Sequence, residues 1–300
     1  MRLKIVFLAL FIAIVTAVCF AASPTIGGIL FKDGKADQKV VEDGAYLTPH
    51  RALYSVRMTS VKSGSQLIDI SGSMYYAVRT TCDAYATDHR FNLVYDYSDS
   101  MPTRITSDFA TYETRDGRKL DFSAIRKRNG EIYEEFRGHA DASKEADGKA
   151  IFSVPEDLAM DLPAGTIYPS EHTMKLLEMA KTGKKFYHAV IFDGSDDEGP
   201  VEVNSFIGEP VNVMAAIDPA KGVDKDIDVD LLNTPAWRIR LAFFPMGSDE
   251  ATSDYEMEVI AHENGVVSDM EIEYDDFTVL QKLIALEKLE PEACQTETKN

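Results

Sequence analysis

Cysteine is the residue type whose placement in this chain suggests covalent chemistry. Cys82 falls on the apolar face of a predicted strand, Cys294 lies six residues from the end of the chain, and Cys19 falls within an apolar N-terminal leader. Two cysteines outside the leader of an exported protein predict one disulfide, because exported compartments are oxidising. Two unpaired thiols remain the alternative. A cysteine-based metal site is disfavoured, since neither cysteine has a CxxC or histidine partner at the usual spacing.

Four aspartates at alternate positions form the next candidate site. Asp224, Asp226, Asp228 and Asp230 would all project to one side of an extended backbone. Like charges repel each other unless water or a cation separates them, so we expect a solvated loop here. Because carboxylate oxygens are the ligands that Ca²⁺ prefers, a weak calcium site is the alternative.

Histidine patterns give little indication of catalysis. His172 lies on a predicted helix, where it could act as a base for a nearby serine, but the chain has no GxSxG nucleophile motif. His50 and Arg51 open a predicted strand and could bind an anion. The histidines lack the HxxxH and HExxH spacings of zinc sites. We therefore expect a non-enzymatic protein without a cofactor.

The first 22 residues have the pattern of a secretory signal peptide. Two cations precede the apolar run 5–18, and small residues follow it, with cleavage expected near Ala21 or Ala22. The run is shorter than the roughly 20 residues that span a bilayer as a helix. Export is therefore expected. A lipid anchor on Cys19 and an uncleaved N-terminal anchor are the alternatives.

The composition is strongly acidic. The chain has 50 Asp and Glu against 31 Lys and Arg, a formal net charge of −19. Nucleic-acid binding depends largely on cations that neutralise phosphates, and anionic membrane surfaces attract cations as well. We therefore expect no nucleic-acid partner, and we expect a monomer.

Alternating apolar and polar residues predict an antiparallel β domain. From Ile70 to Cys82 the apolar positions recur at every second residue, the pattern of a strand with one buried face. The stretch 67–97 is too long for one ordinary strand, so we expect a bend around residues 84–89. The dipeptides Asp116-Gly117 and Asn129-Gly130 suit two-residue hairpin turns because they tolerate positive φ.

These strands belong to a single predicted domain over residues 48–300, after an irregular lead-in at 23–47. Further strands are expected over residues 52–59, 109–114, 118–124, 131–137, 150–154, 186–192, 201–207, 211–216, 236–243, 255–261 and 270–274. Roughly twelve to fourteen strands is more than an open sheet usually carries without curling or closing.

One helix is predicted among the strands. Residues 169–183 carry an apolar side, with Ser170 as the expected N-cap and Gly183 at the position after the C-cap. A lone helix among strands is expected to cover a sheet face or plug its open end. The stretch 277–289 fits either a helix or a strand by its periodicity alone.

Several segments together resemble the EipB-like family of periplasmic cell-envelope integrity proteins. They run in family order over roughly residues 45–295: Thr48–Tyr54, Gly72–Tyr76, Cys82-Asp83, Leu162–Pro169, His172, Leu176-Leu177, Phe192–Gly194, Asn264–Val266 and Cys294. No one of these segments alone is specific to the family, but their order and spacing together are.

The resemblance implies a fold and a role. The fold is one long antiparallel sheet that curls into a β-spiral, or half-open barrel, with one internal helix, and it favours a strand at 277–289. The family also implies a disulfide at Cys82 and Cys294 and a tetratricopeptide-repeat protein as a candidate periplasmic partner. We expect a non-enzymatic protein that supports envelope integrity by binding an apolar ligand or a partner protein. A lipid or lipoprotein carrier is the first alternative, and a hydrolase with an unrecognised site is the second.

Overall fold

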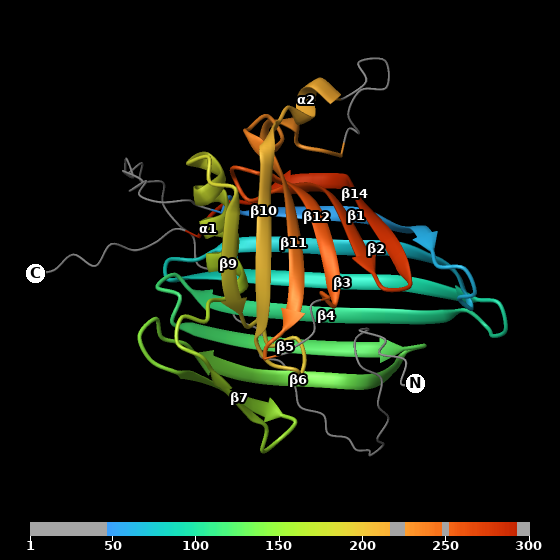
Figure 1. Ribbon diagram of the computed structural model, residues 1–300, viewed down its shortest axis with the longest axis horizontal. Helices are drawn as coiled ribbons and strands as arrows, with labels where there is room; N and C mark the ends of the chain where they lie inside the picture. The colour runs from blue at the N-terminus through green and yellow to red at the C-terminus, as the bar shows by residue number, and fades with distance from the viewer. Residues whose placement is uncertain (1–46, 217–225, 248–251, 293–300) are drawn as a thin grey trace, which may run out of the picture.

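The chain folds into one antiparallel sheet. The computed structural model describes residues 47–216, 226–247 and 252–292, and Figure 1 shows their arrangement. In the described residues the sheet has 14 strands, in the spatial order β8-β7-β6-β5-β4-β3-β2-β1-β14-β13-β12-β11-β10-β9. The sheet thus consists of two meanders, β1–β8 and β9–β14, which are joined where the first strand pairs with the last.

The element bounds follow in chain order. The strands are β1 (His50–Val61), β2 (Leu67–Thr80), β3 (Ala84–Tyr97), β4 (Thr103–Thr114), β5 (Lys119–Arg128), β6 (Glu131–Asp141), β7 (Gly148–Val154), β8 (Ala159–Leu162), β9 (Phe186–Ile191), β10 (Val201–Val211), β11 (Ala236–Pro245), β12 (Tyr255–His262), β13 (Val267–Tyr274) and β14 (Phe277–Lys288). The helical segments are α1 (Pro169–Lys181), the single turn α2 (Val213–Ala216) and the 3₁₀ turn η1 (Val229–Leu231).

The sheet is folded over but not closed. Figure 1 shows the strands of the second meander crossing in front of those of the first, so that the two meanders form two layers. The edge strands, β8 and β9, do not pair with each other. A parallel bridge between Ile167 and Ile191 connects the segment after β8 to the end of β9. The predicted half-open, curled sheet is confirmed.

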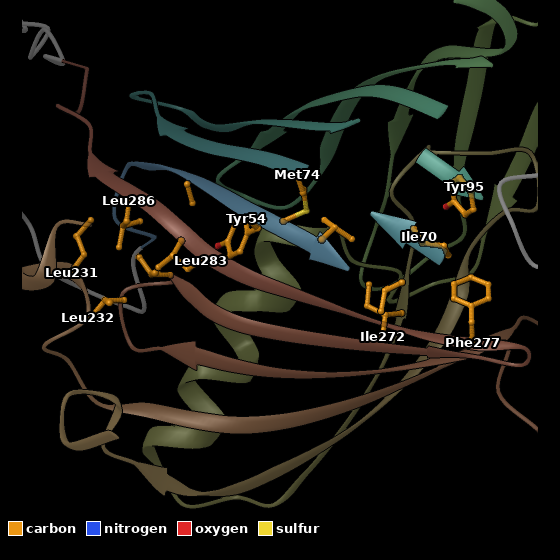
Figure 2. Close-up of a cluster of buried hydrophobic side chains, with 14 of the residues drawn as sticks. Tyr54, Ile70, Met74, Tyr95, Leu231, Leu232, Ile272, Phe277, Leu283 and Leu286 are labelled. Carbon is orange, nitrogen blue, oxygen red and sulfur yellow. The ribbon is translucent and has the colours of Figure 1, made fainter. Parts of the chain in front are cut away.

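Alternating apolar residues from both layers form the core. Figure 2 shows Tyr54, Ile70 and Met74 of β1 and β2 gathered with Ile272 and Leu283 of the second layer. Tyr54 is 2% exposed, and its hydroxyl donates to the Val267 carbonyl oxygen at 2.7 Å. Burial of apolar area, worth about 25 cal/mol per Å², is what holds the two layers together.

Helix α1 lies between the two layers at one end. Its residues Leu176, Leu177 and Ala180 pack with the buried side chains of β9–β12. Met174 packs instead against a small cluster made by Leu47, Val78 and Tyr85. The helix therefore contacts both meanders and plugs one end of the curled sheet, as the sequence predicts. Within the described residues, no helix is long and apolar enough to cross a membrane.

Four local predictions need correction. The turn after β2 is at residues 81–83 and not at 84–89, because the strand pairing ends at Thr80 and Tyr85. Residues 211–216 do not form a separate strand, since β10 continues to Val211 and a helical turn follows. Cys82 does not lie on the buried face: it follows the end of β2 and is exposed.

The fourth correction concerns the start of the helix. Ser170 is not the N-cap: Tyr168 holds that position, and its side chain makes no capping hydrogen bond. The backbone N–H groups of Ser170 and Glu171, which have no partner within the helix, donate to the carboxylate of Glu113 on β4 at 2.7 and 2.8 Å. The cap therefore comes from a distant strand, which the local sequence pattern did not reveal. Gly183, with φ of +73°, does follow the C-cap as predicted.

Candidate functional site

The candidate site is the inner face of the folded sheet, toward which the buried side chains point. The pairing registers place Tyr76, His89 and Phe109 side by side on β2, β3 and β4. Two residues after His89 on β3, Phe91 lies beside Ser107 of β4, and Ser107 lies beside Arg126 of β5. Each inner-face row thus crosses several strands that are consecutive in the chain.

A central patch of this inner face is apolar but only partly buried. It consists of Phe91, Leu93, Ile105 and Phe109 from β3 and β4, and of Met257, Met270 and Tyr274 from β12 and β13. Partly buried apolar side chains are common on outer surfaces, where they need no explanation. On an inner face they indicate a surface that protein surrounds without completely covering it.

The titration of the neighbouring aromatic side chains agrees with this geometry. His89 keeps some accessible surface, yet burial lowers its pKa to about 4. Burial likewise raises the pKa of Tyr274 to about 12, and it raises the pKa of Tyr76 above its usual range. A side chain that is desolvated from most directions but still partly accessible is expected on a concave surface.

Aromatic contacts extend the patch in both layers. The rings of His50, Tyr76, His89 and Phe109 follow one another at centroid distances of 5.6, 4.6 and 6.0 Å. In the other layer Phe243, Tyr255, Tyr274 and Phe277 form a similar series, at 4.3, 5.7 and 4.8 Å. These large rings could make favourable contacts with an apolar molecule.

A row of polar residues borders the patch. Ser107, Arg126 and Glu134 are neighbours across β4, β5 and β6, and Arg126 is 5% exposed. The Nη1 of Arg126 donates to Oε2 of Glu134 at 2.5 Å, whereas its buried Nε has no hydrogen-bond partner. Nothing in the sequence identified this pair, because the residues fall in ordinary strand positions eight apart.

An acidic turn, residues 193–199, lies close to this row. Asp196 interacts electrostatically with Arg126, and burial raises the pKa of Asp196 to about 6. The residue before the turn holds it in place, since Phe192 contacts the Phe122 ring at a centroid distance of 5.7 Å. Gly194 has φ of +74° and lies against the face of the same ring, so a side chain at this position would collide with it.

His172, the histidine considered as a candidate base, lies in the packed interior. His172 is 6% exposed, stacks on the Tyr187 ring, and has a pKa that burial lowers to about 4. His262 does contact Ser268 at 3.2 Å, but it is 0% exposed and out of reach of a substrate. Both histidines therefore serve the packing of the interior.

The other predicted sites differ in outcome. His50 is buried, and its Nδ1 donates to the Thr48 carbonyl oxygen at 2.8 Å, whereas Arg51 pairs with Glu287 on the outer face. Because Nδ1 faces a carbonyl oxygen, it must be the donor in this contact. The two side chains point to opposite faces and form no joint anion site.

The segment considered as a weak calcium site does not have the extended geometry that this alternative requires. Asp224 lies outside the described residues, whereas Asp228 and Asp230 belong to a tight turn in which Oδ1 of Asp228 accepts from the Asp230 backbone N–H at 3.1 Å. The backbone is therefore not extended there. The part of the chain that the structure describes contains no group of three or more His, Cys, Asp or Glu that could hold a metal ion.

The disulfide prediction involves residues at the limit of the structure. Cys294, Cys19 and the predicted leader lie outside the described residues. The last described segment runs beside the end of β2, where the backbone N–H of Glu292 donates to the Thr80 carbonyl at 3.3 Å. Each of these two residues is two positions from one cysteine of the predicted pair.

Comparisons with known proteins agree with the resemblance found in the sequence. The profile of a family described as EipB-like matches residues 42–290. The cell envelope integrity protein EipB of Brucella abortus (strain 2308) is 30% identical over 253 residues, which are 80% of this chain and 84% of that protein. The crystal structure of a β-barrel-like protein from Brucella abortus, of a domain of unknown function, has a TM-score of 0.75 and 25% identity, and the match covers 82% of this chain and 100% of that one.

Proposed function

Since this chain belongs to the EipB-like family, we propose that it supports the integrity of a Gram-negative cell envelope from the periplasm, by binding an apolar ligand. The role is taken from the related protein of Brucella abortus, whose name describes envelope integrity. The location follows from the signal-peptide pattern of the first 22 residues. The tetratricopeptide-repeat partner and the monomeric state remain predictions.

The observation that carries the ligand proposal is the central patch. Phe91 packs against the same buried cluster as Met257 and Met270 of the opposite layer. Phe109 packs against a second cluster, which contains Phe122, and all four patch residues remain partly accessible. Fully burying one such side chain is worth about 1.5–3 kcal/mol. An apolar molecule on the inner face would gain part of this energy from each of several side chains, because they are only partly buried without it.

The same site does not favour hydrolysis. A general base works best with a pKa near the operating pH. His172 and His262 have pKa values of about 4 because of burial, and neither is exposed to solvent. A binding role on the inner face is therefore the function that the side chains support best.

We further propose that Cys82 and Cys294 form a disulfide in the exported protein. The hydrogen bond between Glu292 and Thr80 supports this pairing, because it brings the two chain segments together close to both cysteines. The bond would link the end of β2 to the C-terminal segment that follows β14. The two strands β1 and β14 that hold the meanders together lie beside it.

Native mass spectrometry tests the binding proposal directly. The full exported chain, purified from envelope extracts without detergent, is expected to carry a noncovalent adduct with the mass of a lipid or another apolar molecule. Extraction with organic solvent would then identify it. A population that is free of adducts after every detergent-free preparation would contradict ligand binding and favour docking of a partner protein.

A further inference from the structure

The polar row beside the central patch contains an arginine that is not satisfied by protein groups. Arg126 is 5% exposed, and its side chain pairs with Glu134 on the neighbouring strand. Its Nε is buried and lacks a hydrogen-bond partner. A buried donor without a partner costs about 1–3 kcal/mol. The inner face of β5 therefore presents an N–H group for which an acceptor is missing.

The groups around this arginine are predominantly acidic. Glu134 forms an ion pair with Arg126, and Asp196 of the acidic turn interacts electrostatically with the same guanidinium. Asp197 and Glu198 interact electrostatically with Glu134. A purely anionic ligand would meet repulsion here, whereas a ligand that brings a cation together with its acceptor oxygen would be attracted by both signs of charge.

The position of the row relates it to the central patch. Ser107 lies between Phe91 of the patch and Arg126 in the same cross-strand row. A molecule with an apolar part on the patch would therefore place its polar end near Arg126 and the acidic turn. This geometry is that of an amphiphile binding site with separate regions for tail and head.

We propose that Arg126, Glu134 and Asp196 form a subsite for the zwitterionic head group of a phospholipid. A phosphate oxygen accepts from Nε of Arg126, and the ammonium group lies among the carboxylates of the acidic turn. The inference rests on the proposed function, since it assumes that the acyl chains occupy the central patch.

Competition with an apolar fluorescent probe tests the subsite. The mature chain is loaded with N-phenyl-1-naphthylamine, which is then displaced by short-chain phosphatidylethanolamine or by phosphatidylglycerol with the same acyl chains. We expect the ethanolamine lipid to displace the probe at about tenfold lower concentration, the equivalent of one charge-assisted hydrogen bond. Arg126→Gln should weaken displacement by both lipids, because both carry the phosphate that Nε of Arg126 would bind, and it should leave the preference for the ethanolamine lipid in place.

Two further variants make the test decisive. Asp196→Asn, in the turn, should reduce the same preference even if Arg126→Gln fails to fold. Arg238→Gln removes an arginine that pairs with Glu258 on the outer face, and it should leave the preference unchanged. Three results would overturn the head-group subsite alone: equal displacement by both lipids, undiminished lipid displacement in a folded Arg126→Gln variant, or an undiminished preference in Asp196→Asn. Failure of the unmodified chain to bind the probe would instead contradict the proposed function.

Discussion

At the scale of single residues, two positions explain how a sheet of this length is fixed in one shape. Gly194 allows the acidic turn to lie on the Phe122 ring, and Glu113 joins β4 to the start of α1. Neither interaction is local in sequence. Each attaches a segment that follows β8 to a strand of the first meander.

Gly194→Ala is expected to destabilise the protein. A methyl group there would lie 2.3 Å from Cγ of Phe122, and the backbone φ of +74° is unfavourable for alanine. The backbone cost is about 1–2 kcal/mol and overpacking adds about 1–3 kcal/mol. Urea unfolding measures the difference. Gly64→Ala is the matched control: its φ is +87° but its new methyl group meets nothing within 4 Å, so it should show only the backbone cost.

Glu113 is expected to make stability depend on pH. Burial raises its pKa to about 7 from 4.5. Between these two values the native state holds a proton that the unfolded state has lost, so this group's contribution to stability falls as the pH rises. The full effect is about 3 kcal/mol.

The comparison of the unmodified chain with Glu113→Gln isolates this effect, because the amide does not titrate. The free energy of unfolding of the parent, relative to that of the variant, should increase from pH 8 to pH 5. A constant difference over this range would show that burial does not raise the pKa of Glu113.

At the scale of elements, α1 is expected to be part of the cooperative core. Leu177 is 1% exposed and packs with side chains of β9–β12. Leu177→Ala should cost about 2–5 kcal/mol and shift one single unfolding transition. The exposed neighbour Glu178 provides the control, because Glu178→Ala should change stability little. Two separate transitions, or equal effects of both substitutions, would contradict the role of α1 as a packed plug.

The elements themselves were largely predictable from the sequence. Asn129 and Gly130 have φ of 51° and 92°, and they form the hairpin between β5 and β6 that their residue types predict. The period of the apolar residues likewise predicts which face of most strands and of the helix is buried, because it too is a local property of the sequence. The strand over 277–289 required the family resemblance, since its apolar positions fit two periods.

Interactions across long sequence distances were not predictable. Glu113 caps a helix 57 residues later, and β1 pairs with β14 at the other end of the domain. Arg126 and Glu134 become neighbours only through the register of β5 and β6, which includes a bulge at Arg126/Lys127. A single sequence carries the local preferences of each strand but no direct record of which strand lies beside which.

At the scale of the whole molecule, the proposed disulfide would close the fold. Its loop of 212 residues corresponds to about 5 kcal/mol in the chain-entropy description. Cys82→Ser and Cys294→Ser should each lower the midpoint of thermal unfolding, and reductant should lower the parent to the same value. Reductant should not affect the variants. Identical midpoints in all samples would show that the bond is absent or contributes nothing.

The fold and the family together define what this molecule can do as a whole. The two meanders enclose an inner face whose apolar side chains are incompletely covered, while α1 plugs one end and the acidic turn lies over a polar row. The arrangement suits the binding of an amphiphile better than catalysis. Envelope integrity would then depend on what the inner face holds.

The most direct measurement of this central claim compares two aromatic residues on one strand. Phe109 and Tyr112 belong to β4 but point to opposite faces, the inner and the outer. The affinity for N-phenyl-1-naphthylamine, measured by fluorescence, should fall at least about tenfold in Phe109→Ser, because a buried phenyl group contributes about 1.5–3 kcal/mol. It should be unchanged in Tyr112→Ser. Equal affinity in both folded variants would contradict ligand binding on the inner face.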